Sequence, residues 1–550
     1  MTPPTRLYLL RAATGVACVA ALAACWVIFY RLASGSFYAF ALIGDEGSYA
    51  VHLQPLLAGC TKTNQFNGLC DPRYISQWFL EDFIRTAISL SGLDTISFVW
   101  LWRFVYPCLL LGAVVLLARA CLPRARAGWS WELRGAAAAL AFTLLYLLYD
   151  LLVSYPPLQG WLHRFPTNIE FILSVLLAER FISFLAAPMP VNGITLALAS
   201  AALVYLRPYT AIPWSLTIVI GLLWLIATRQ VAFKVAFITL GALLLALAPW
   251  TAVLLWDRAL PVYAQVLARN SHHRLYEINP RWQLYLGLGA AFATLAIWLP
   301  RPQRVLLWAS GLSMFMLPFI SSLFIFAVQL HDYERFAAFF LVILVSAGLL
   351  ALGRYSLAWR GSKDLAASGV LLASAFLAAG ILGWRNANYD LQNYPEGPYQ
   401  SMHEELKYLP AYDWIREHTA PSALFLFDDG CDWSTGRLPE DAHTLSNLLV
   451  QGDLFQLVAR RRRVLAERII SAAFSDDDLE ALRILQCGTF GFPVGNNYLP
   501  ALKRFPPNYI FIRKETPLTR GMLPKFKTSS EKVYADPVCE VWKINYSTHE

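Results

Sequence analysis

Residues 41–60 read ALIGDEGSYAVHLQPLLAGC, and they follow the first long apolar run of the chain, Ala12–Tyr30. That run is long enough to cross a bilayer as a helix. Basic residues precede it and no convincing cleavage site follows, so we predict a signal anchor with a cytoplasmic amino end. The neighbouring carboxylates Asp45 and Glu46, with a glycine on either side, then lie close to the point where the chain leaves the membrane.

The composition predicts a polytopic membrane protein. Of the 550 residues, 57% are hydrophobic and only 15% are charged, and the mean hydropathy is +0.46. Soluble domains are far more polar. The net charge of +8 is better explained by Lys and Arg in the loops between spans than by affinity for nucleic acid, because these residues gather at the ends of apolar runs. We therefore expect membrane lipids and no nucleic acid among the partners.

Apolar runs of roughly 17 to 25 residues predict about eleven transmembrane helices. With a cytoplasmic amino end, the connections richest in Arg and Lys all lie on the inner side. The least certain helices are the short pair near residues 178 and 200, either of which could be re-entrant; we keep both, because losing one would reverse the basic loops. The predicted centres are near residues 20, 107, 145, 178, 200, 220, 246, 291, 316, 345 and 375.

The sequence changes character after Trp384. We predict a transmembrane domain over residues 1–384, whose first outer loop is 31–95, and a soluble extracytoplasmic α/β domain over residues 385–550. The segments LKYLPAYDWIREHTA and SDDDLEALRILQ have helical patterns. Expected strands are ALFLFDD, RRVLA, NYIFIRK and CEVWKINY. The basic run Arg460–Arg463 is interpreted as a solvated strand entry.

Cysteines on the predicted outer side can form disulfides if that compartment is oxidising. Cys60 and Cys70 would close a short loop directly after the carboxylate pair, and we take them as the candidate bridge.

A carboxylate pair in a loop is by default a solvated surface feature. Here, however, apolar residues flank it, glycines permit a tight turn, and two amphipathic stretches follow, SYAVHLQPLLAG and RYISQWFLEDFIRTAISL. We expect these stretches to lie along the membrane surface as helices. Such helices would hold the first outer loop, and its carboxylates, against the lipid.

Asp45-Glu46-Gly47-Ser48-Tyr49 at this position resembles the acidic motif of the GT-C superfamily, in particular its protein O-mannosyltransferase and lipid A aminoarabinose transferase branches. The resemblance implies an inverting glycosyltransferase at the outer leaflet, with a polyprenyl-phosphate sugar as donor. It assigns the base that deprotonates the acceptor hydroxyl to Asp45 and an orienting role to Glu46, and these roles could be exchanged. Tyr49 would contact substrate.

A departing phosphate needs cations and hydrogen-bond donors. Arg335, at the outer entrance of a predicted span, is the first candidate, and the resemblance supports it. Arg207, beside the helix-breaking Pro208, is a weaker one, because a structural corner explains it equally well. His331 and one of the adjacent His272 and His273 complete the set of phosphate- or sugar-binding candidates.

The sequence leaves other questions open. A divalent metal is compatible with the acidic and histidine residues of the outer loops, but no specific ligand spacing occurs. The acceptor could be a lipid, a polysaccharide or a protein of the cell envelope. The expected location is the inner membrane of a bacterium, with a periplasmic carboxyl-terminal domain. Three alternatives remain: a lipid-linked glycan polymerase or ligase, a non-enzymatic transporter or flippase of lipid-linked precursors, and a partner-binding protein that has lost catalysis.

Overall fold

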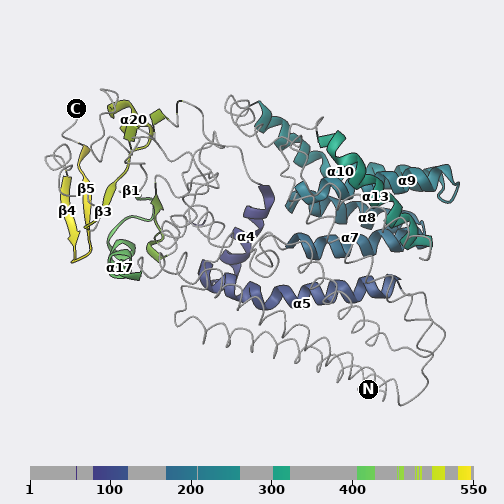
Figure 1. Ribbon diagram of the computed structural model, residues 1–550, viewed down its shortest axis with the longest axis horizontal. Helices are drawn as coiled ribbons and strands as arrows, with labels where there is room; N and C mark the ends of the chain where they lie inside the picture. The colour runs from purple at the N-terminus through teal and green to yellow at the C-terminus, as the bar shows by residue number, and fades with distance from the viewer. Residues whose placement is uncertain are drawn as a thin grey trace, which may run out of the picture. The chain divides into compact units, whose positions relative to one another are not determined.

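The computed structural model describes residue 57, residues 78–121, 169–206, 208–259, 301–321, 406–427, 498–514 and 530–546, and a few positions between 455 and 485 (Figure 1). The chain divides into two compact units. The first comprises Met1–Gly35, Leu101–Leu254 and His273–Asp390, and the second comprises Ser36–Trp100, Leu255–His272 and Leu391–Glu550. The predicted boundary at residues 384/385 lies outside the described residues.

Helix α4 (Trp78–Ser91) and helix α5 (Thr95–Cys121) are separated by a short turn whose residues explain both ends. Gly92, at φ +66°, takes the left-handed conformation that commonly ends a helix. The Asp94 carboxylate then accepts hydrogen bonds from the Ser97 backbone N–H at 2.9 Å and from the Ser97 hydroxyl at 3.1 Å. This is an N-cap, and it starts α5 at the residue that follows.

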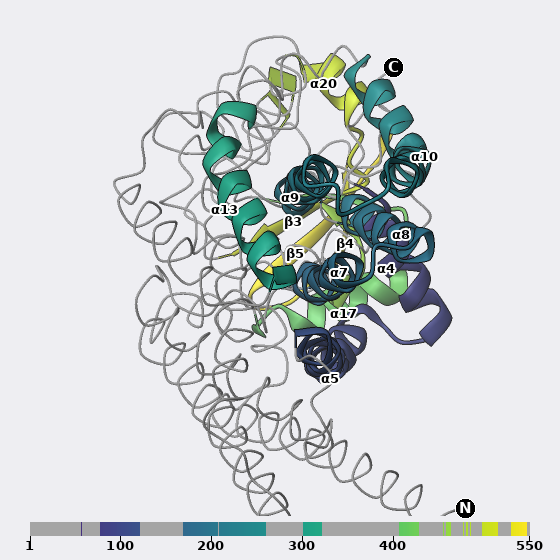
Figure 2. The same cartoon turned by 90° about the vertical axis from the view of Figure 1, so that its right-hand side faces the viewer.

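Among the described residues, five helices that follow α5 lie largely in the first unit, and each corresponds to a predicted span. Figure 2 views α7, α8, α9 and α10 nearly end-on, with α13 tilted against them. Helix α8 begins at a proline only a few residues after α7 ends, so both members of the uncertain pair are helical, and that both cross the membrane stays a prediction. The bounds are α7 Ile169–Ala186, α8 Pro190–Leu206, α9 Pro208–Ala227, α10 Phe233–Arg258 and α13 Arg301–Ser321.

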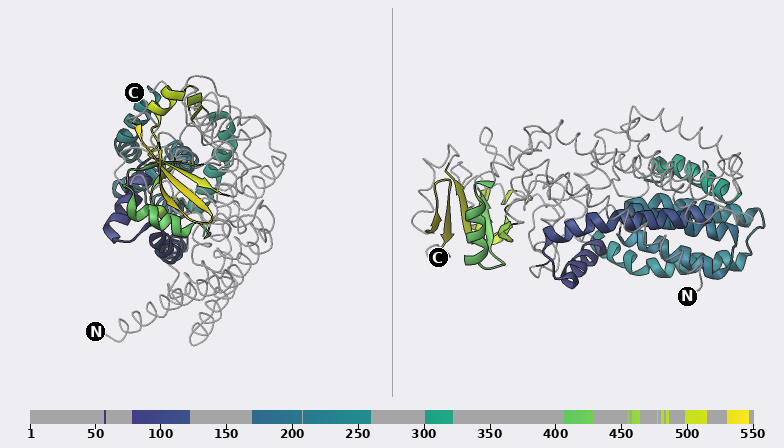
Figure 3. Two further views of the ribbon diagram at one scale, coloured as in Figure 1. Left: turned by 90° about the vertical axis from the view of Figure 1, so that its left-hand side faces the viewer. Right: turned by 90° about the horizontal axis from the view of Figure 1, so that it is seen from below.

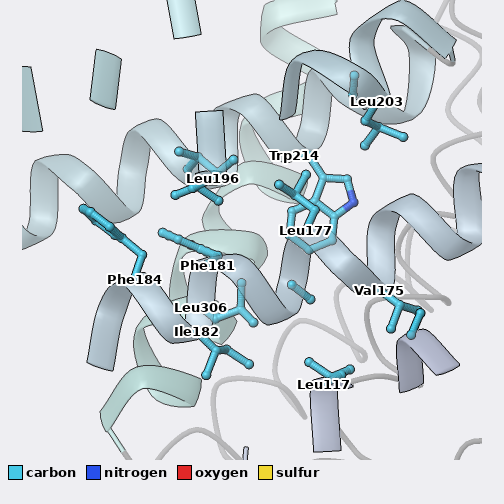
Figure 4. Packing of buried hydrophobic residues seen from close by; sticks show 14 of the residues in the cluster. Leu117, Val175, Leu177, Phe181, Ile182, Phe184, Leu196, Leu203, Trp214 and Leu306 are labelled. Carbon is cyan, nitrogen blue, oxygen red and sulfur yellow. The ribbon is translucent and has the colours of Figure 1, made fainter. Parts of the chain in front are cut away.

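Helix α7 forms the centre of the apolar core of this unit. Figure 4 shows Phe181 and Phe184 of α7 near Leu196 of α8, and Leu306 of α13 beside Ile182. All five side chains are almost completely buried. Side chains of α5, α9 and α10 also belong to the cluster, as does Val231 just before α10.

Two glycines permit close approach between helices. A Cβ added to Gly221 of α9 would lie 2.3 Å from Cζ of Phe181, and one added to Gly193 of α8 would lie 2.0 Å from Oγ1 of Thr239. Small residues at helix contacts are typical of helices that pack in lipid. By contrast, a Cβ on Gly241 would meet nothing within 4 Å.

Hydroxyl groups provide hydrogen bonds between helices near two prolines. Ser313 of α13 donates to the carbonyl of Pro213 in α9 at 2.9 Å, and Tyr205 of α8 donates to the carbonyl of Ala246 in α10 at 2.8 Å. Ala246 lies three residues before Pro249, whereas the carbonyl that the missing N–H of Pro249 leaves without a helical partner is that of Leu245. The Tyr205 hydrogen bond therefore links α8 to α10 close to the helix position that the proline weakens.

In the second unit a five-stranded sheet has the order β2-β1-β3-β5-β4. Strands β1, β2 and β3 are parallel, whereas β5 runs antiparallel to both β3 and β4. Helix α17 (Leu409–His418) and helix α20 (Tyr498–Arg504) accompany the sheet, and Figure 3 (left) shows α17 beside the strands. The strands are β1 Leu424–Phe427, β2 Arg462–Arg463, β3 Tyr509–Arg513, β4 Ser530–Ala535 and β5 Cys539–Ile544.

Each predicted strand has a counterpart in this sheet, and α17 lies within the predicted helix LKYLPAYDWIREHTA. Of SDDDLEALRILQ, only isolated positions are described. Strand β4 and helix α20 were not predicted. The sequence of β4, SEKVYA, lacks the apolar alternation that marks a strand with one buried face, because β4 is an exposed edge strand.

Rings form the core between α17 and the sheet. Tyr408, the N-cap residue of α17, and Tyr412 within α17 contact Phe511 of β3, with ring centroids 5.7 Å apart in each pair. Phe427 of β1 stacks on Phe511 at 4.8 Å, and Phe455 meets Phe427 edge-on at 4.6 Å. Aromatic pairs in these geometries add to the stabilisation from buried area.

One residue of the basic run Arg460–Arg463 is not solvated, so that part of the interpretation is wrong. Arg461 is only 6% exposed. Its guanidinium donates to the hydroxyl of Thr419 at 2.8 Å and to the carbonyls of Arg416 and Thr419 at 2.6 Å each. A cation here satisfies carbonyls that the carboxyl end of α17 leaves without N–H partners. Burial, followed by the nearby Arg416, lowers the pKa of Arg461 from its usual value.

The turn between β4 and β5 is organised by Asp536. Its carboxylate accepts hydrogen bonds from the N–H groups of Val538 and Cys539, at 2.8 and 2.7 Å, and from the Tyr534 hydroxyl at 3.0 Å. Burial alone would raise the pKa of Asp536, but these hydrogen bonds outweigh it and the net pKa is lowered. Burial and the hydrogen bond to Asp536 raise the pKa of Tyr534 to about 12.

Candidate functional site

The residues predicted from the sequence to form the site lie outside the described part of the chain. Their roles therefore remain predictions, and the structure neither brings them together nor separates them. They are the candidate catalytic pair Asp45 and Glu46, the candidate binding residues Tyr49, Arg207, His272, His273, His331 and Arg335, and the candidate disulfide Cys60–Cys70.

The described element nearest in sequence to the carboxylate motif is α4. It forms as a helix within the predicted second amphipathic stretch of the first outer loop. Ile84 and Ile88, four residues apart, are buried, while Phe83 and Leu90, seven residues apart, are exposed, Leu90 to 83%. Two apolar side chains that share an exposed face suit a helix at the membrane surface. The ion pair between Asp82 and Arg85, at 3.0 Å, supplies polar groups on the same helix, so α4 is amphipathic.

Large apolar side chains are exposed along the helices of the first unit. On α10 these include Phe233, Phe237, Leu244 and Leu245, the last at 78% exposure. A soluble protein rarely exposes so continuous an apolar surface, whereas lipid favours it. Within the described residues, one helical stretch, Phe233–Ala252, is long and apolar enough to cross a membrane, and shorter apolar helices occupy Pro190–Leu206 and Pro213–Ala227.

The break between α8 and α9 falls at the predicted helix-breaking corner. Helix α8 ends at Leu206 and α9 begins at Pro208. Proline suits the first turn of a helix, because its missing N–H would have no intrahelical partner there. Arg207 lies outside the described residues, so a structural corner and a binding role for Arg207 both remain predictions.

Sequence reasoning missed a charged pair inside α7. Glu179 is 6% exposed within the apolar run, and its neighbour Arg180 donates from Nε to the Glu179 carboxylate. The Ser183 hydroxyl donates to the other carboxylate oxygen at 2.9 Å. The signal available in the sequence was two adjacent charges in the middle of ILSVLLAERFISFLA. Ionisable residues in such positions are costly and are often functional.

A metal site gains no support from the described ranges, which contain no group of three or more His, Cys, Asp or Glu side chains that could hold an ion. Most of the acidic and histidine residues considered as ligands lie elsewhere in the chain. Cys539 is buried in β5 and, in the part of the chain that is described, forms no disulfide.

The chain is similar to solved structures but matches no family model. No curated protein matches it. The chain is similar to the crystal structure of ArnT from Cupriavidus metallidurans bound to undecaprenyl phosphate, at 13% sequence identity and a TM-score of 0.46. The similarity covers 94% of this chain and 97% of that one. This TM-score is too low to establish a shared fold.

Proposed function

We propose that this protein is an integral membrane glycosyltransferase of the GT-C type. It transfers a sugar from a polyprenyl-phosphate donor to a cell-envelope acceptor on the outer face of the inner membrane. The observation that carries the proposal is the sequence Asp45-Glu46-Gly47-Ser48-Tyr49, placed directly after the first apolar run. The amphipathic helix α4, which ends the same outer loop, and the exposed apolar faces of α8 to α10 support it.

In this proposal Asp45 takes the proton of the acceptor hydroxyl as the new bond to the anomeric carbon forms. The bond between that carbon and the phosphate oxygen breaks, with inversion, and polyprenyl phosphate departs with its electron pair. Glu46 orients the acceptor, and Arg335 neutralises charge on the departing phosphate, with contributions from Arg207 and the histidines. A positioned general base typically contributes a rate factor of roughly 10² to 10⁴.

The proposal is tested by following the donor. Purified full-length protein in nanodiscs is supplied with a panel of polyprenyl-phosphate sugars and an envelope extract as acceptor source, and release of polyprenyl phosphate is measured by mass spectrometry. Enzyme-dependent release from at least one donor is expected, together with a glycosylated product. If every donor remains intact at a level matched by empty nanodiscs, the proposed activity is wrong.

One observation favours a second candidate, a transporter or flippase of lipid-linked precursors. Buried charge within apolar helices is characteristic of transport pathways, and Glu179 of α7 is such a residue. A transporter would move an intact lipid-linked sugar between leaflets without cleaving it. The same donor panel separates the two, because only the glycosyltransferase releases free polyprenyl phosphate.

A further inference from the structure

The pair Glu179 and Arg180 forms an ordered polar arrangement on α7. The Glu179 carboxylate is fixed by two donors, the Ser183 hydroxyl and Nε of Arg180. A carboxylate that is 6% exposed is costly to bury unless it is paired and hydrogen-bonded, and Glu179 has both kinds of partner. Its position is therefore set from within the helix, by residues one and four positions further along.

The Arg180 side chain is oriented by this carboxylate but extends beyond it. Its relative exposure is 40%, and in the described residues Glu179 is its sole hydrogen-bonding or ionic partner. Because Nε is engaged, the two Nη groups, which carry four of the five guanidinium N–H donors, are left for another acceptor. This edge of a guanidinium binds phosphate with two parallel hydrogen bonds.

The surroundings define which acceptor is available. The rest of α7 near this point is apolar, with Leu177, Phe181 and Ile182 buried in the helical core. An exposed guanidinium on a helix in hydrocarbon must reach a polar group, and long Arg side chains do so by extending toward the headgroups. Arg180 lies about two turns before the end of α7 at Ala186. If α7 crosses the membrane as the sequence predicts, this distance places headgroup phosphates within reach of the Arg180 side chain.

We propose that Arg180 binds the phosphate of a membrane phospholipid and that Glu179 is the positioning residue that holds its guanidinium in the binding orientation. The inference depends on the membrane placement of the helical unit but not on glycosyl transfer. In the predicted topology this end of α7 faces the cytoplasm, across the membrane from the transfer site.

The test is lipid binding by the full-length protein in detergent. Native mass spectrometry measures retention of added phosphatidylglycerol by wild type, Arg180→Gln, Arg180→Lys and Glu179→Gln. Loss of a bidentate, charge-assisted contact predicts about tenfold weaker binding for Arg180→Gln. Arg180→Lys keeps the charge without the fork and should be intermediate, and so should Glu179→Gln, which keeps the Arg but removes its anchoring charge. Size-exclusion profiles identify any variant that fails to fold.

A control variant separates specific binding at Arg180 from nonspecific attraction of anionic lipid to any exposed cation. Arg301→Gln removes an exposed cation from the first turn of α13 and should leave binding within about twofold of wild type. Equal losses for Arg301→Gln and Arg180→Gln, or wild-type binding by Arg180→Gln, would overturn the proposal.

Parallel binding measurements with undecaprenyl phosphate and inorganic phosphate identify the source of the phosphate. Arg180-dependent preference for either over phosphatidylglycerol would contradict the assignment to a phospholipid. Absence of donor turnover would bear only on the proposed function.

Discussion

The helices of the first unit and the sheet of the second unit differ in the side chains that they expose: apolar on the helices, charged or polar around the sheet. On α10, large apolar side chains point outward as well as inward, whereas on α17 the apolar residues Ala411, Tyr412 and Ile415 are buried and charged residues occupy the outside. Strand β4 likewise presents Glu531 and Lys532 outward. The hydrophobic effect alone explains α17 and β4 in water, but it leaves the outer face of α10 unexplained unless lipid covers that face. We therefore assign lipid as the surroundings of α10 and water as the surroundings of α17 and β4.

The largest effect on stability is expected where a charge is placed on the surface assigned to lipid. Leu245→Lys, near the middle of Phe233–Ala252, should cost about 3 kcal/mol of insertion free energy. Leu90→Lys on α4, at the expected interface, should cost far less. A membrane-insertion assay compares the two, and an insertion level for Leu245→Lys equal to that of Leu90→Lys would indicate that α10 faces water.

The second unit allows the reverse test, in which a buried charge is removed rather than an exposed one added. Arg461→Ala removes the donor to Thr419 and Arg416 and leaves buried carbonyls unsatisfied, so we expect about 2 to 3 kcal/mol of local destabilisation. Hydrogen exchange of the α17 and β2 amides measures it. Arg460→Ala, at the exposed neighbour, should change exchange little; equal effects of the two substitutions would show that burial of Arg461 contributes nothing.

Two glycine-to-alanine substitutions in the first unit should change stability by a somewhat smaller amount. The two changes should have opposite signs, because only one of the glycines lies at a close helix contact. Gly221→Ala should destabilise by about 1 to 2 kcal/mol, because its Cβ would meet the buried Phe181 ring. Gly241→Ala meets nothing and should stabilise α10 slightly, since Ala favours helix. Thermal unfolding in nanodiscs compares them, and equal shifts for both would exclude the tight contact between α7 and α9.

The smallest effect concerns the β4–β5 turn and is pH-dependent. The folded pKa of Asp536 is lowered, so its contribution to stability is complete above its ordinary value of 3.8 and is lost as the pH falls below that value. Asp536→Ala should cost about 1 kcal/mol at pH 7 and remove this acid sensitivity. Hydrogen exchange of β4 and β5 amides between pH 3 and 7, corrected for intrinsic rates, is the measurement; an unchanged acid response in the variant would assign it to another group.

The sequence predicts those parts of the fold that depend on local sequence patterns. Apolar runs predict α5, α7, α8, α9 and α10 well, because the bilayer imposes length and composition on each span independently. Helix α13 spans Arg301–Ser321, so it begins earlier than the predicted centre near residue 316 suggests, and Arg301 and Arg304 lie in its first turn. The sheet strands with buried faces are also predicted, whereas the charged edge strand β4 is not.

Long-range pairing accounts for what could not be predicted. The burial of Arg461 depends on carbonyls of α17 that lie far away in the sequence, and no local pattern distinguishes it from Arg460. The contact of Gly221 with Phe181 likewise depends on the packing of α7 against α9. The site itself was predicted from a short motif and its position in the chain, and Asp45 and Arg335 lie outside the described residues.

The most direct measurement of the central claim is single-turnover donor cleavage by Asp45→Asn, alongside Glu46→Gln and the control Asp94→Asn, whose carboxylate caps α5. With a donor that wild type consumes, Asp45→Asn should lower the rate by roughly 10² to 10⁴ while donor affinity stays within severalfold of wild type. If Asp45→Asn and Glu46→Gln both release polyprenyl phosphate at the wild-type rate, the carboxylates after the first span are not catalytic and the assignment of the base to this motif is contradicted.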